Sequence, residues 1–420
     1  MWEWWNQLRR RVTQRFAPSN LHSISDPNLL AYYGFPGPSD SGETVTESTA
    51  LGLSAVYRAV SLVSGTIATL PLRSLRDTGD GMRQRVKSFL DTPGGPDSLS
   101  GLTTYEWKET VTAHLLLGGD AFLAHMRAGG GQLIGLAPIH PLCVTVEWAK
   151  HWPNSERPVL GGKLFTATLE DGTRQYFDAS TMTHIPGLSL DGLRGMSVIA
   201  MARNSLGTAL AGERAAGRTF RNGGLISGMV TPEDDLDPDE QDTVRRDLDN
   251  RLTGVDNAGK IALLNRRLKF TPWTMSAQDA QFLESRQFSI EEIARWFGVP
   301  PHLLMQTDKQ TSWGTGVDEQ NRGLSRYVLN GWTTRIEQRL SRLLPTPVFC
   351  EFDFAGLERP DVAQEIDLLI KQIDSGLLTL NEARAIRNMP PVEGGDAPRS
   401  SVQSAPLAQP ADTEREAVAA

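Results

Sequence analysis

The 420-residue sequence contains few cysteines and no long hydrophobic run. Its two cysteines, Cys143 and Cys350, are far apart and form no CxxC motif. This excludes a disulfide-based fold and a cysteine-rich zinc site, and it favours a reducing compartment such as the cytosol. The longest apolar runs have about five residues, whereas a membrane-spanning helix needs roughly 18. We therefore expect no segment that crosses a bilayer.

The sequence also lacks an excess of positive charge. It has 42 Lys and Arg against 50 Asp and Glu, a formal net charge of -8. Proteins that grip DNA tightly are usually basic, so a sequence-specific DNA binder is disfavoured. A protein that lets DNA slide past is still allowed, because Lys and Arg contacts are what make DNA binding tight. The length exceeds that of one compact core and predicts two or more domains.

Common catalytic motifs are missing as well. The sequence has no GxxxxGK[ST], no HExxH and no GxSxG. His184 and His302 each stand alone beside a proline, which favours structural roles. Asp279, Glu284 and Glu291 fall on different sides of one predicted helix, so they do not converge on a metal ion. We predict no catalytic, cofactor-binding or metal-binding residue, and we keep a metal-dependent nuclease only as an alternative hypothesis.

The N-terminal stretch MWEWWNQLRRRVTQRF combines tryptophans with a basic run. It lacks the apolar core and cleavage site of a signal peptide. Two hypotheses fit it: an interfacial membrane anchor, and an arm that packs on a neighbouring subunit, which we favour. Residues 17–46 are rich in Pro, Ser and Gly and predict an irregular arm, and the composition of residues 396–420 predicts disorder.

Periodic patterns predict a mixture of helices and strands. Apolar residues at three- and four-residue spacing predict helices over about 49–69, with Ser48 as the N-cap, and over about 103–117. Strands follow, with hairpin turns at the triple glycine 129–131 and at Asp171-Gly172.

The second half of the sequence is more helical. Residues 197–221 are rich in small and helix-forming residues and predict one helix about 37 Å long. Its small side chains suit the close approach of another helix, such as one from a second copy. A later helix ends at Gly298 and Pro300-Pro301. The other predicted elements are strands at 225–230, 260–265, 268–273 and 348–354, helices at 237–254, 277–297, 317–344, 360–374 and 379–388, and a polar loop at 305–316.

Seven segments, in this order, resemble the portal proteins of tailed bacteriophages, of the type with long non-contractile tails. Each segment is weak alone, but the ordered set is specific, and the resemblance covers roughly residues 48–396. The segments are GLSAVYRAVSLVSGTIATLPL (52–72), HIPGLSLDGLRGMSVIAMAR (184–203), FRNGGLISGMV (220–230), NAGKIALLN (257–265), DAQFLESRQFSIEEIARWFGVPPHLL (279–304), TSWGTGVDEQNRGL (311–324) and LTLNEARAIRNMPPVEGGD (378–396).

The resemblance implies a homo-oligomeric ring, of twelve subunits, at one capsid vertex. Double-stranded DNA would pass through its channel without sequence preference, driven by the large subunit of a separate terminase. The ring would nucleate procapsid assembly with scaffolding protein and major capsid protein, and would later hold the head–tail adaptor. It implies a virion protein that assembles in the host cytoplasm, with no enzymatic activity, no cofactor and no stable membrane association. The alternatives are a nuclease and a peripheral membrane protein.

The implied fold class is α+β, a portal-type subunit with a mixed α/β wing, a helical stem, a small α/β clip and a helical crown. The implied regions are an N-terminal arm (1–46), wing (47–190), first stem helix (191–222), clip (223–274), second stem helix (275–298), tunnel loop (299–316), long helix and wing strand (317–354), crown (355–395) and disordered tail (396–420).

The resemblance also assigns roles to individual residues. Twelve chains of charge -8 give a nominal ring charge of 12 × -8 = -96, which would repel DNA phosphates from the channel wall. Lys309 would offset this locally by contacting phosphate, or is an ordinary solvated lysine. The assigned residues are Gln306, Thr307, Asp308, Lys309, Gln310, Thr311 and Ser312 in the DNA-facing loop, Ala200, Gly207, Ala211, Ala215, Phe282, Ile290, Ile293 and Phe297 in stem packing, and Pro300 and Pro301 at the hinge.

Overall fold

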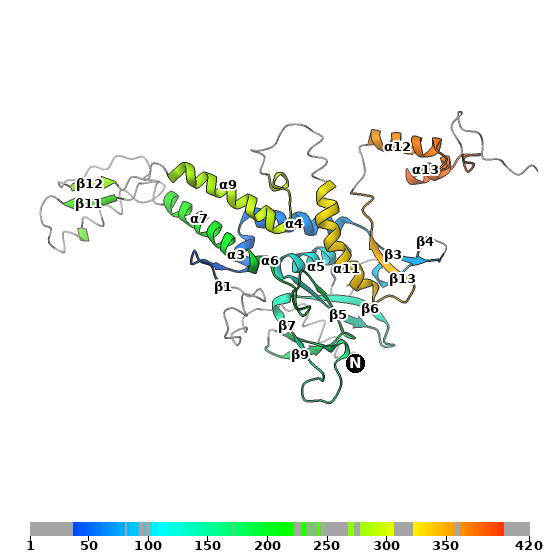
Figure 1. The fold of residues 1–420 in the computed structure, drawn as a ribbon, viewed down its shortest axis with the longest axis horizontal. Coiled ribbons are helices and arrows are strands. Elements are labelled where there is room, and N and C mark those ends of the chain that lie inside the picture. The colour runs from blue at the N-terminus through cyan, green and yellow to red at the C-terminus, as the bar shows by residue number, and fades with distance from the viewer. Residues whose placement is uncertain are drawn as a thin grey trace, which may run out of the picture. The chain divides into compact units, whose positions relative to one another are not determined.

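The chain contains both helices and antiparallel sheets, which confirms the predicted α+β class (Figure 1). In the computed structural model, the chain forms two compact units, Met1–Asp353 and Phe354–Ala420. The structure describes residues 37–79, 82–91, 96, 101–169, 171–221, 228–232, 237, 242–243, 246, 268–272, 278–305, 322–357 and 362–398, with side chains left out at 219–221, 228–232, 268–272, 278–287 and 362–364.

The first predicted helix is divided in two. A short helix, α3 (Glu47–Leu51), ends at Gly52, and α4 (Ser54–Thr69) follows it. Thr46, and not Ser48, caps α3, because its hydroxyl accepts a hydrogen bond from the Thr49 amide. The predicted apolar face of α4 is confirmed by the buried residues Val56, Ala59, Val60, Val63 and Ile67.

Helix α5 (Thr104–Gly118) packs along α4. It begins with a reciprocal capping box between Thr103 and Glu106. Trp107 is completely buried, and its Nε1 donates to the Leu136 carbonyl at 2.8 Å. The buried Lys108 Nζ donates to the Leu70 carbonyl at 2.5 Å, and burial lowers the pKa of this amine to about 8. These contacts fix α5 to the end of α4.

Two three-stranded antiparallel sheets share one core. The first has the order β10 (Met182–Pro186), β5 (Asp120–Arg127), β6 (Leu133–Ile139), and the second the order β7 (Val144–Trp148), β8 (Lys163–Thr168), β9 (Arg174–Phe177). Both predicted hairpins are confirmed, with Gly131 and Gly172 at positive φ in their turns. The shared core consists of Phe122, Ala124, Met126, Ala137, Ile139, Cys143, Val144, Phe165, Ala167, Phe177 and Met182.

A third sheet has the order β13 (Val348–Phe352), β3 (Leu72–Asp77), β4 (Arg83–Arg85). Helix α11 (Asn330–Ser341) packs on β13 and β10. We predicted one regular helix over 317–344, but a π-helix, η7 (Leu324–Leu329), precedes α11. A π-helical turn adds only one residue, so it leaves the spacing of the flanking apolar residues almost unchanged. The sequence pattern therefore does not distinguish a regular α-helix from one that begins with a π-helix. Short 3-10 turns lie at Phe89–Asp91, Pro141–Cys143, Leu160–Gly162 and Pro301–Leu304.

Two small hairpins complete the first unit. Strand β1 (Gly37–Pro38) pairs with β2 (Thr44–Val45), and β11 (Gly228–Pro232) pairs with β12 (Leu268–Pro272). The strands predicted at 225–230 and 268–273 are therefore confirmed over residues 228–230 and 268–272, and residues 225–227 and 273 lie outside the described residues. The predicted strand at 260–265 and nearly all of the predicted helix at 237–254 lie outside the described residues.

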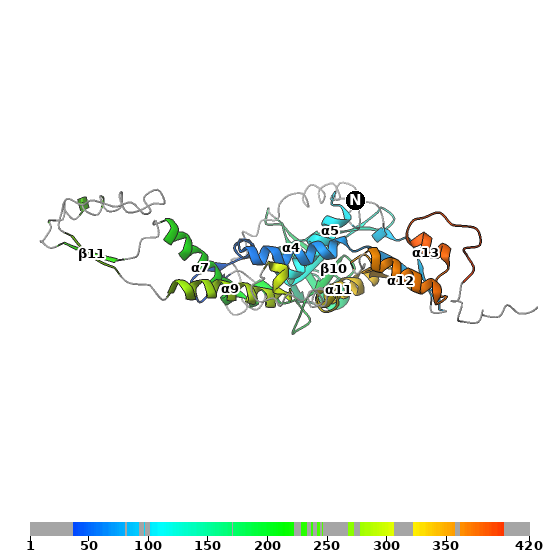
Figure 2. The ribbon, with the colours of Figure 1, turned by 90° about the horizontal axis from the view of Figure 1, so that it is seen from above.

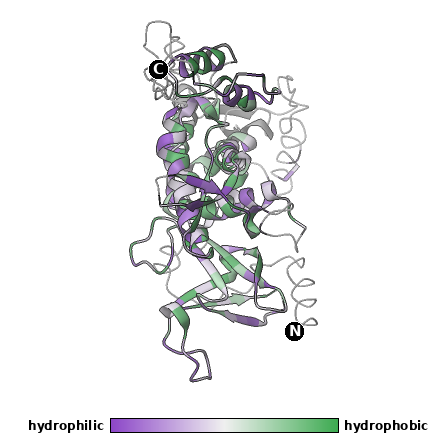
Figure 3. Cartoon of the chain, turned by 90° about the vertical axis from the view of Figure 1, so that its right-hand side faces the viewer, coloured by the Kyte–Doolittle hydropathy of each residue, from purple (hydrophilic) through white to green (hydrophobic). Residues whose placement is uncertain are grey.

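The second unit contains two helices, α12 (Val362–Asp374) and α13 (Leu380–Ile386), close to the predicted bounds. Thr379 and Glu382 form a capping box at the start of α13, and Arg387 pairs with Glu365 at 2.9 Å. Hydrophobic and hydrophilic residues are interspersed along the helices of the chain (Figure 3). None of the described helices is long and apolar enough to cross a membrane.

Candidate functional site: a helix pair, its connecting segment and a buried ionic junction

The residues predicted to face DNA, Gln306–Ser312, lie outside the described residues. The structure describes both ends of the segment that contains them. Helix α9 (Gln278–Phe297) ends at Gly298, which adopts φ +67°, and the Val299 amide donates back to the Ala294 carbonyl at 2.9 Å. This closing turn uses the left-handed conformation that favours glycine.

The two prolines predicted as a hinge follow this turn. Pro300 is the N-cap of the 3-10 turn Pro301–Leu304, which also contains His302. The Arg58 Nε of α4 donates to the Leu303 carbonyl at 3.2 Å. The prolines therefore lie in a turn that is anchored to α4 just before the undescribed residues begin.

The other end of the segment lies next to the first. A Cβ placed on Gly298 would lie 3.2 Å from the Val328 Cγ2 of η7. Both ends are thus held on one body, while Met305 and Tyr327 beside them are 75% and 77% exposed.

Helices α7 (Arg203–Arg221) and α9 pack against each other and lie side by side in both views (Figures 1 and 2). Of the residues predicted to pack on α9, Ile293 and Phe297 are 3% and 4% exposed. Ile290 is half-buried, and the side chain of Phe282 lies outside the described residues. The described part of α9 also packs on α4, so its apolar face contributes to the core of this subunit.

The prediction of one continuous helix over 197–221 is wrong at a single residue. A short helix, α6 (Val198–Met201), ends at Ala202, and α7 begins at Arg203. The Ser197 hydroxyl accepts from the Ala200 amide and donates to the Leu117 carbonyl at 2.6 Å. These bonds tie the first turn to the end of α5 and set its direction independently of α7.

The small residues of α7 have different neighbours. Gly207 is buried against the β1–β2 turn, since a Cβ there would lie 2.1 Å from the Ser39 Oγ. It therefore meets a hairpin of its own chain, and not another helix as we predicted. Ala200 on α6 and Ala211 on α7 are half-buried, and Ala215 is exposed. The small-residue surface is divided between contacts within the chain and open surface.

A buried ionic junction lies where the sheets lead into α6. Asp120 is completely buried at the start of β5. Its Oδ1 accepts from the His184 Nε2 at 2.8 Å and from the Gly195 amide at 2.7 Å, and its Oδ2 accepts from the Arg194 Nε at 3.0 Å. His184 also stacks on the ring of Phe122, with centroids 4.7 Å apart. This packing agrees with the structural role predicted for His184, but the sequence did not indicate its partner Asp120.

Sequence reasoning missed Asp120 and Arg194 altogether. Arg194 also donates to the carbonyls of Val144 and Pro141, both at 3.3 Å. The junction thus connects both sheets of the shared core to the segment that enters α6. Two sequence features could have indicated the junction: a lone aspartate at the start of an apolar strand, and an Arg-Gly pair before a helix.

Three glycine backbones cross beside the junction. The Gly187 amide donates to the Gly119 carbonyl at 2.8 Å, and Gly119 adopts φ +77°. A Cβ on Gly195 would lie only 1.8 Å from that same carbonyl oxygen. A side chain at this crossing would collide with backbone, so glycine is required for the chain segments to approach so closely.

The charges of the junction favour an ionised Asp120. Burial raises the pKa of this carboxyl, but the hydrogen bond from His184 and the charge of Arg194 outweigh it, and the net pKa is lowered. Burial lowers the pKa of His184, and Asp120 opposes this only in part. All three side chains are buried, and their hydrogen bonds connect the two sheets to the segment that leads into α6.

Asp120→Asn is expected to lower the free energy of unfolding by about 3 kcal/mol at pH 7, because it leaves the buried Arg194 without its charge partner. A carboxyl with a lowered folded pKa contributes stability above its unfolded pKa, near 3.9, and loses it as the pH falls through the folded pKa. The difference in free energy of unfolding between wild type and variant should therefore be constant above about pH 5 and should shrink below pH 4. Urea unfolding across this range measures this difference. A difference that grows in acid would contradict an ionised Asp120.

No metal centre is present in the part of the chain that the structure describes: no group of three or more His, Cys, Asp or Glu residues is placed to hold an ion. Of the acidic residues considered for a nuclease, Glu291 lies on α9, half-buried, while the side chains of Asp279 and Glu284 lie outside the described residues. Arg295 lies over the ring of Phe288, with 5.5 Å from its Cζ to the centroid.

Comparison with known proteins identifies related sequences. The family model described as phage portal protein matches residues 54–388. A probable portal protein of Streptomyces phage phiC31 is 33% identical over 377 residues, which cover 88% of this chain and 81% of the relative.

Solved structures share the fold. The crystal structure of an HK97-family phage portal protein from Corynebacterium diphtheriae has a TM-score of 0.55 and 20% identity, and the match covers 77% of this chain and 99% of that one. A chain from the neck of a native gene transfer agent particle, computed with C12 symmetry, has a TM-score of 0.52 and 21% identity, covering 87% of this chain and 98% of that one.

Proposed function

This chain belongs to the phage portal protein family, and we propose that it is the subunit of a ring that forms the DNA channel at one vertex of a phage capsid. The observation that carries the proposal is the family match, which extends over residues 54–388 and includes every described helix of the first unit from α4 onward. The twelvefold symmetry of the related particle neck supports a ring of copies.

The regions of the chain fit the parts of such a subunit. The sheets and α4–α5 correspond to the wing, α6–α7 and α9 to the two stem helices, and α12–α13 to the crown. Strands β11 and β12 pair with each other within the segment that connects the two stem helices, and this pairing supports a compact clip at 223–274. In this assignment the buried junction around Asp120 fixes the angle at which the first stem helix leaves the wing.

The channel would pass double-stranded DNA during packaging and ejection without base recognition. The acidic balance of the chain supports this, because a negative wall does not hold the phosphate backbone. The described residues on both sides of 306–321 are held on one body, and this supports our proposal of a loop that presents Gln306–Ser312 to DNA at a fixed height of the channel. Contacts from Lys309 would be to phosphate, since packaging has to tolerate any sequence.

The proposed partners follow the same life cycle. Scaffolding protein and major capsid protein would assemble around the ring in the host cytoplasm. The large terminase subunit would dock on the clip, and the head–tail adaptor would replace it after filling. In the finished virion the ring would act as the head–tail connector.

The ring is tested by electron micrographs of the purified full-length protein. We expect round particles with a central hole, because a rotational ring is closed by two different faces of each subunit. A chain that stays monomeric at all protein and salt concentrations, and on co-expression with its capsid protein, would refute the proposal.

The proposal assigns no chemistry to the chain. Purified protein with magnesium and double-stranded DNA should give no cleavage. Cleavage that disappears in Glu284→Ala or Glu291→Ala would replace the ring by the nuclease hypothesis. Flotation of the intact protein with liposomes would instead support the peripheral membrane alternative.

A further inference from the structure

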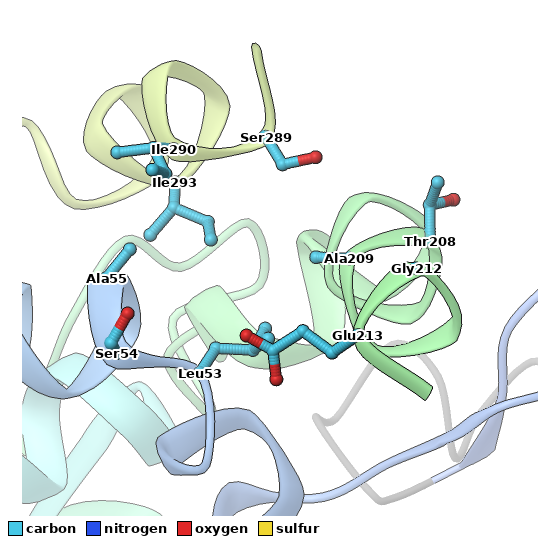
Figure 4. A pocket seen from close by; sticks show the side chains of 10 residues that line it. All are labelled: Leu53, Ser54, Ala55, Thr208, Ala209, Gly212, Glu213, Ser289, Ile290 and Ile293. Carbon is cyan, nitrogen blue, oxygen red and sulfur yellow. The ribbon is translucent and has the colours of Figure 1, made fainter. Parts of the chain in front are cut away.

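An open pocket lies between α4, α7 and α9 (Figure 4). It contains about 540 Å³ of space, part of it open to solvent. Small and apolar side chains form most of its wall, and the described residues that line it include no aromatic side chain. The lining residues are Leu53, Ser54, Ala55, Thr208, Ala209, Gly212, Glu213, Ser289, Ile290 and Ile293.

One charge lies in this pocket. Glu213 extends from α7 into it and is the only charged residue among those that line it (Figure 4). The neighbouring Arg214 forms an ion pair with Glu43, whereas no ion pair joins Glu213 to another described residue. The start of α4 beside it has no side-chain cap. Among the described residues, the pocket is thus lined mostly by small and apolar side chains and by one carboxylate, that of Glu213.

The β1–β2 turn lies on the opposite side of α7. Ser39 packs on Gly207, and Asp40 accepts a hydrogen bond from the Asn204 Nδ2 at 2.7 Å. At about 100° per residue, Gly207 points roughly 160° away from Ala209 and roughly 140° away from Gly212. Figure 1 likewise shows β1 and α9 on different sides of α7.

The sequence before Gly37 complements the pocket. Residues 1–16 contain three tryptophans, at positions 2, 4 and 5, and four arginines against one glutamate. Tryptophan is a rigid, largely apolar anchor that gains much from a close-walled pocket, and an arginine can pair with Glu213. No other stretch of the chain combines clustered tryptophans with a basic run.

We propose that the pocket binds the N-terminal arm of the neighbouring copy in the ring, with a tryptophan between α4, α7 and α9 and an arginine on Glu213. The inference rests on the proposed ring. A chain emerging at Gly37 leaves from the face of α7 that points away from its own pocket. A ring joins one face of each subunit to a different face of the next, so an arm that leaves this face can reach the pocket of a neighbour.

The length of the arm allows this reach. Thirty-six residues precede Gly37, and a flexible chain of that length has an end-to-end distance of about 30 Å. The arm would therefore link subunits beyond the contacts of the folded parts and strengthen the ring without adding to its folded interface.

A disulfide-trapping experiment on the full-length protein tests the inference. The two native cysteines are buried, and burial raises the pKa of the Cys350 thiol to about 11, so they react little. Rings of the double variant Asn6→Cys/Ser289→Cys are imaged and then oxidised. We expect a ladder of linked chains on non-reducing gels. The matched control pairs Asn6→Cys with Ser155→Cys on the exposed β7–β8 loop, and should give no ladder.

The outcomes separate the inference from the proposed function. Intact rings without a ladder would refute the docked arm but leave the ring standing. A disulfide that forms within each chain, with no ladder, would show that the pocket binds the arm of its own chain. That result would overturn the proposed exchange between copies. Absence of rings would overturn both proposals.

Single changes test the two halves of the site separately. In the trapping background, Trp4→Ala/Trp5→Ala should nearly abolish the ladder, and Glu213→Gln should reduce its rate by up to about fivefold, as expected for one exposed ion pair. Gly212→Leu fills the pocket and should act like the tryptophan changes, with thermal unfolding recorded to show that α7 is intact. Unchanged ladders in all three variants would refute the inference.

Discussion

Gly195→Ala is expected to yield little or no folded protein, with a loss of more than about 5 kcal/mol in the free energy of unfolding. The added Cβ would lie 1.8 Å from the Gly119 carbonyl oxygen and 2.7 Å from the Gly187 nitrogen. Both atoms belong to backbone, so no side-chain rotation relieves the collision. The Gly195 amide also donates to Asp120, and moving it away would leave a buried carboxylate with one hydrogen bond fewer.

A glycine in open space provides the matched control. Gly331 lies in α11, and apart from its chain neighbours and the backbone of its own helix no atom lies within 4 Å of the position its Cβ would take. Gly331→Ala should therefore stabilise the protein by up to about 1 kcal/mol, the usual gain of alanine over glycine within a helix. Urea unfolding of both variants measures the contrast. If Gly195→Ala unfolds within 1 kcal/mol of the wild type, the three backbones do not cross as closely as described.

The local parts of the fold were predictable because their causes are local. The spacing of Val56, Val60 and Val63 depends only on the helical repeat, and burial on one face of α4 followed. The turns at Gly131 and Gly172 require a positive φ, and the glycines in the sequence indicate such positions. The N-cap position was less accurate, since Ser48 and Thr46 are both suitable caps and their positions in the sequence do not decide between them.

The junction was not predictable, because its partners are brought together only by the tertiary fold. Asp120 lies 64 residues before His184 and 74 before Arg194. No helical or strand repeat connects positions so far apart, and each residue alone has an ordinary surface explanation. The same holds for Gly207, whose neighbour Ser39 comes from the other end of the unit. Family resemblance indicated that the segment around residue 194 matters, but not that it encloses a buried carboxylate.

Deleting Gln306–Ser312 is expected to abolish stable DNA filling while rings still assemble. The deletion removes seven of the sixteen residues from 306 to 321 and leaves nine, which span up to about 30 Å when extended. The ends stay anchored, because Arg58 holds the Leu303 carbonyl and Gly298 lies against Val328. The change therefore removes the part proposed to reach DNA without disturbing α9 or α11. Nuclease-protected DNA in assembled heads, measured beside particle images, reports both effects.

Two further variants separate length from chemistry. Replacing the seven residues by glycine and serine at equal length keeps the reach but removes Lys309 and the other side chains. If contact with phosphate matters, this variant and Lys309→Ala should both retain less DNA than the wild type. The difference in retained DNA should narrow at high salt, because salt screens contacts between lysine and DNA phosphates. If only the length matters, both should fill normally while the deletion fails. Normal filling by the deletion itself would remove residues 306–312 from any DNA-facing role.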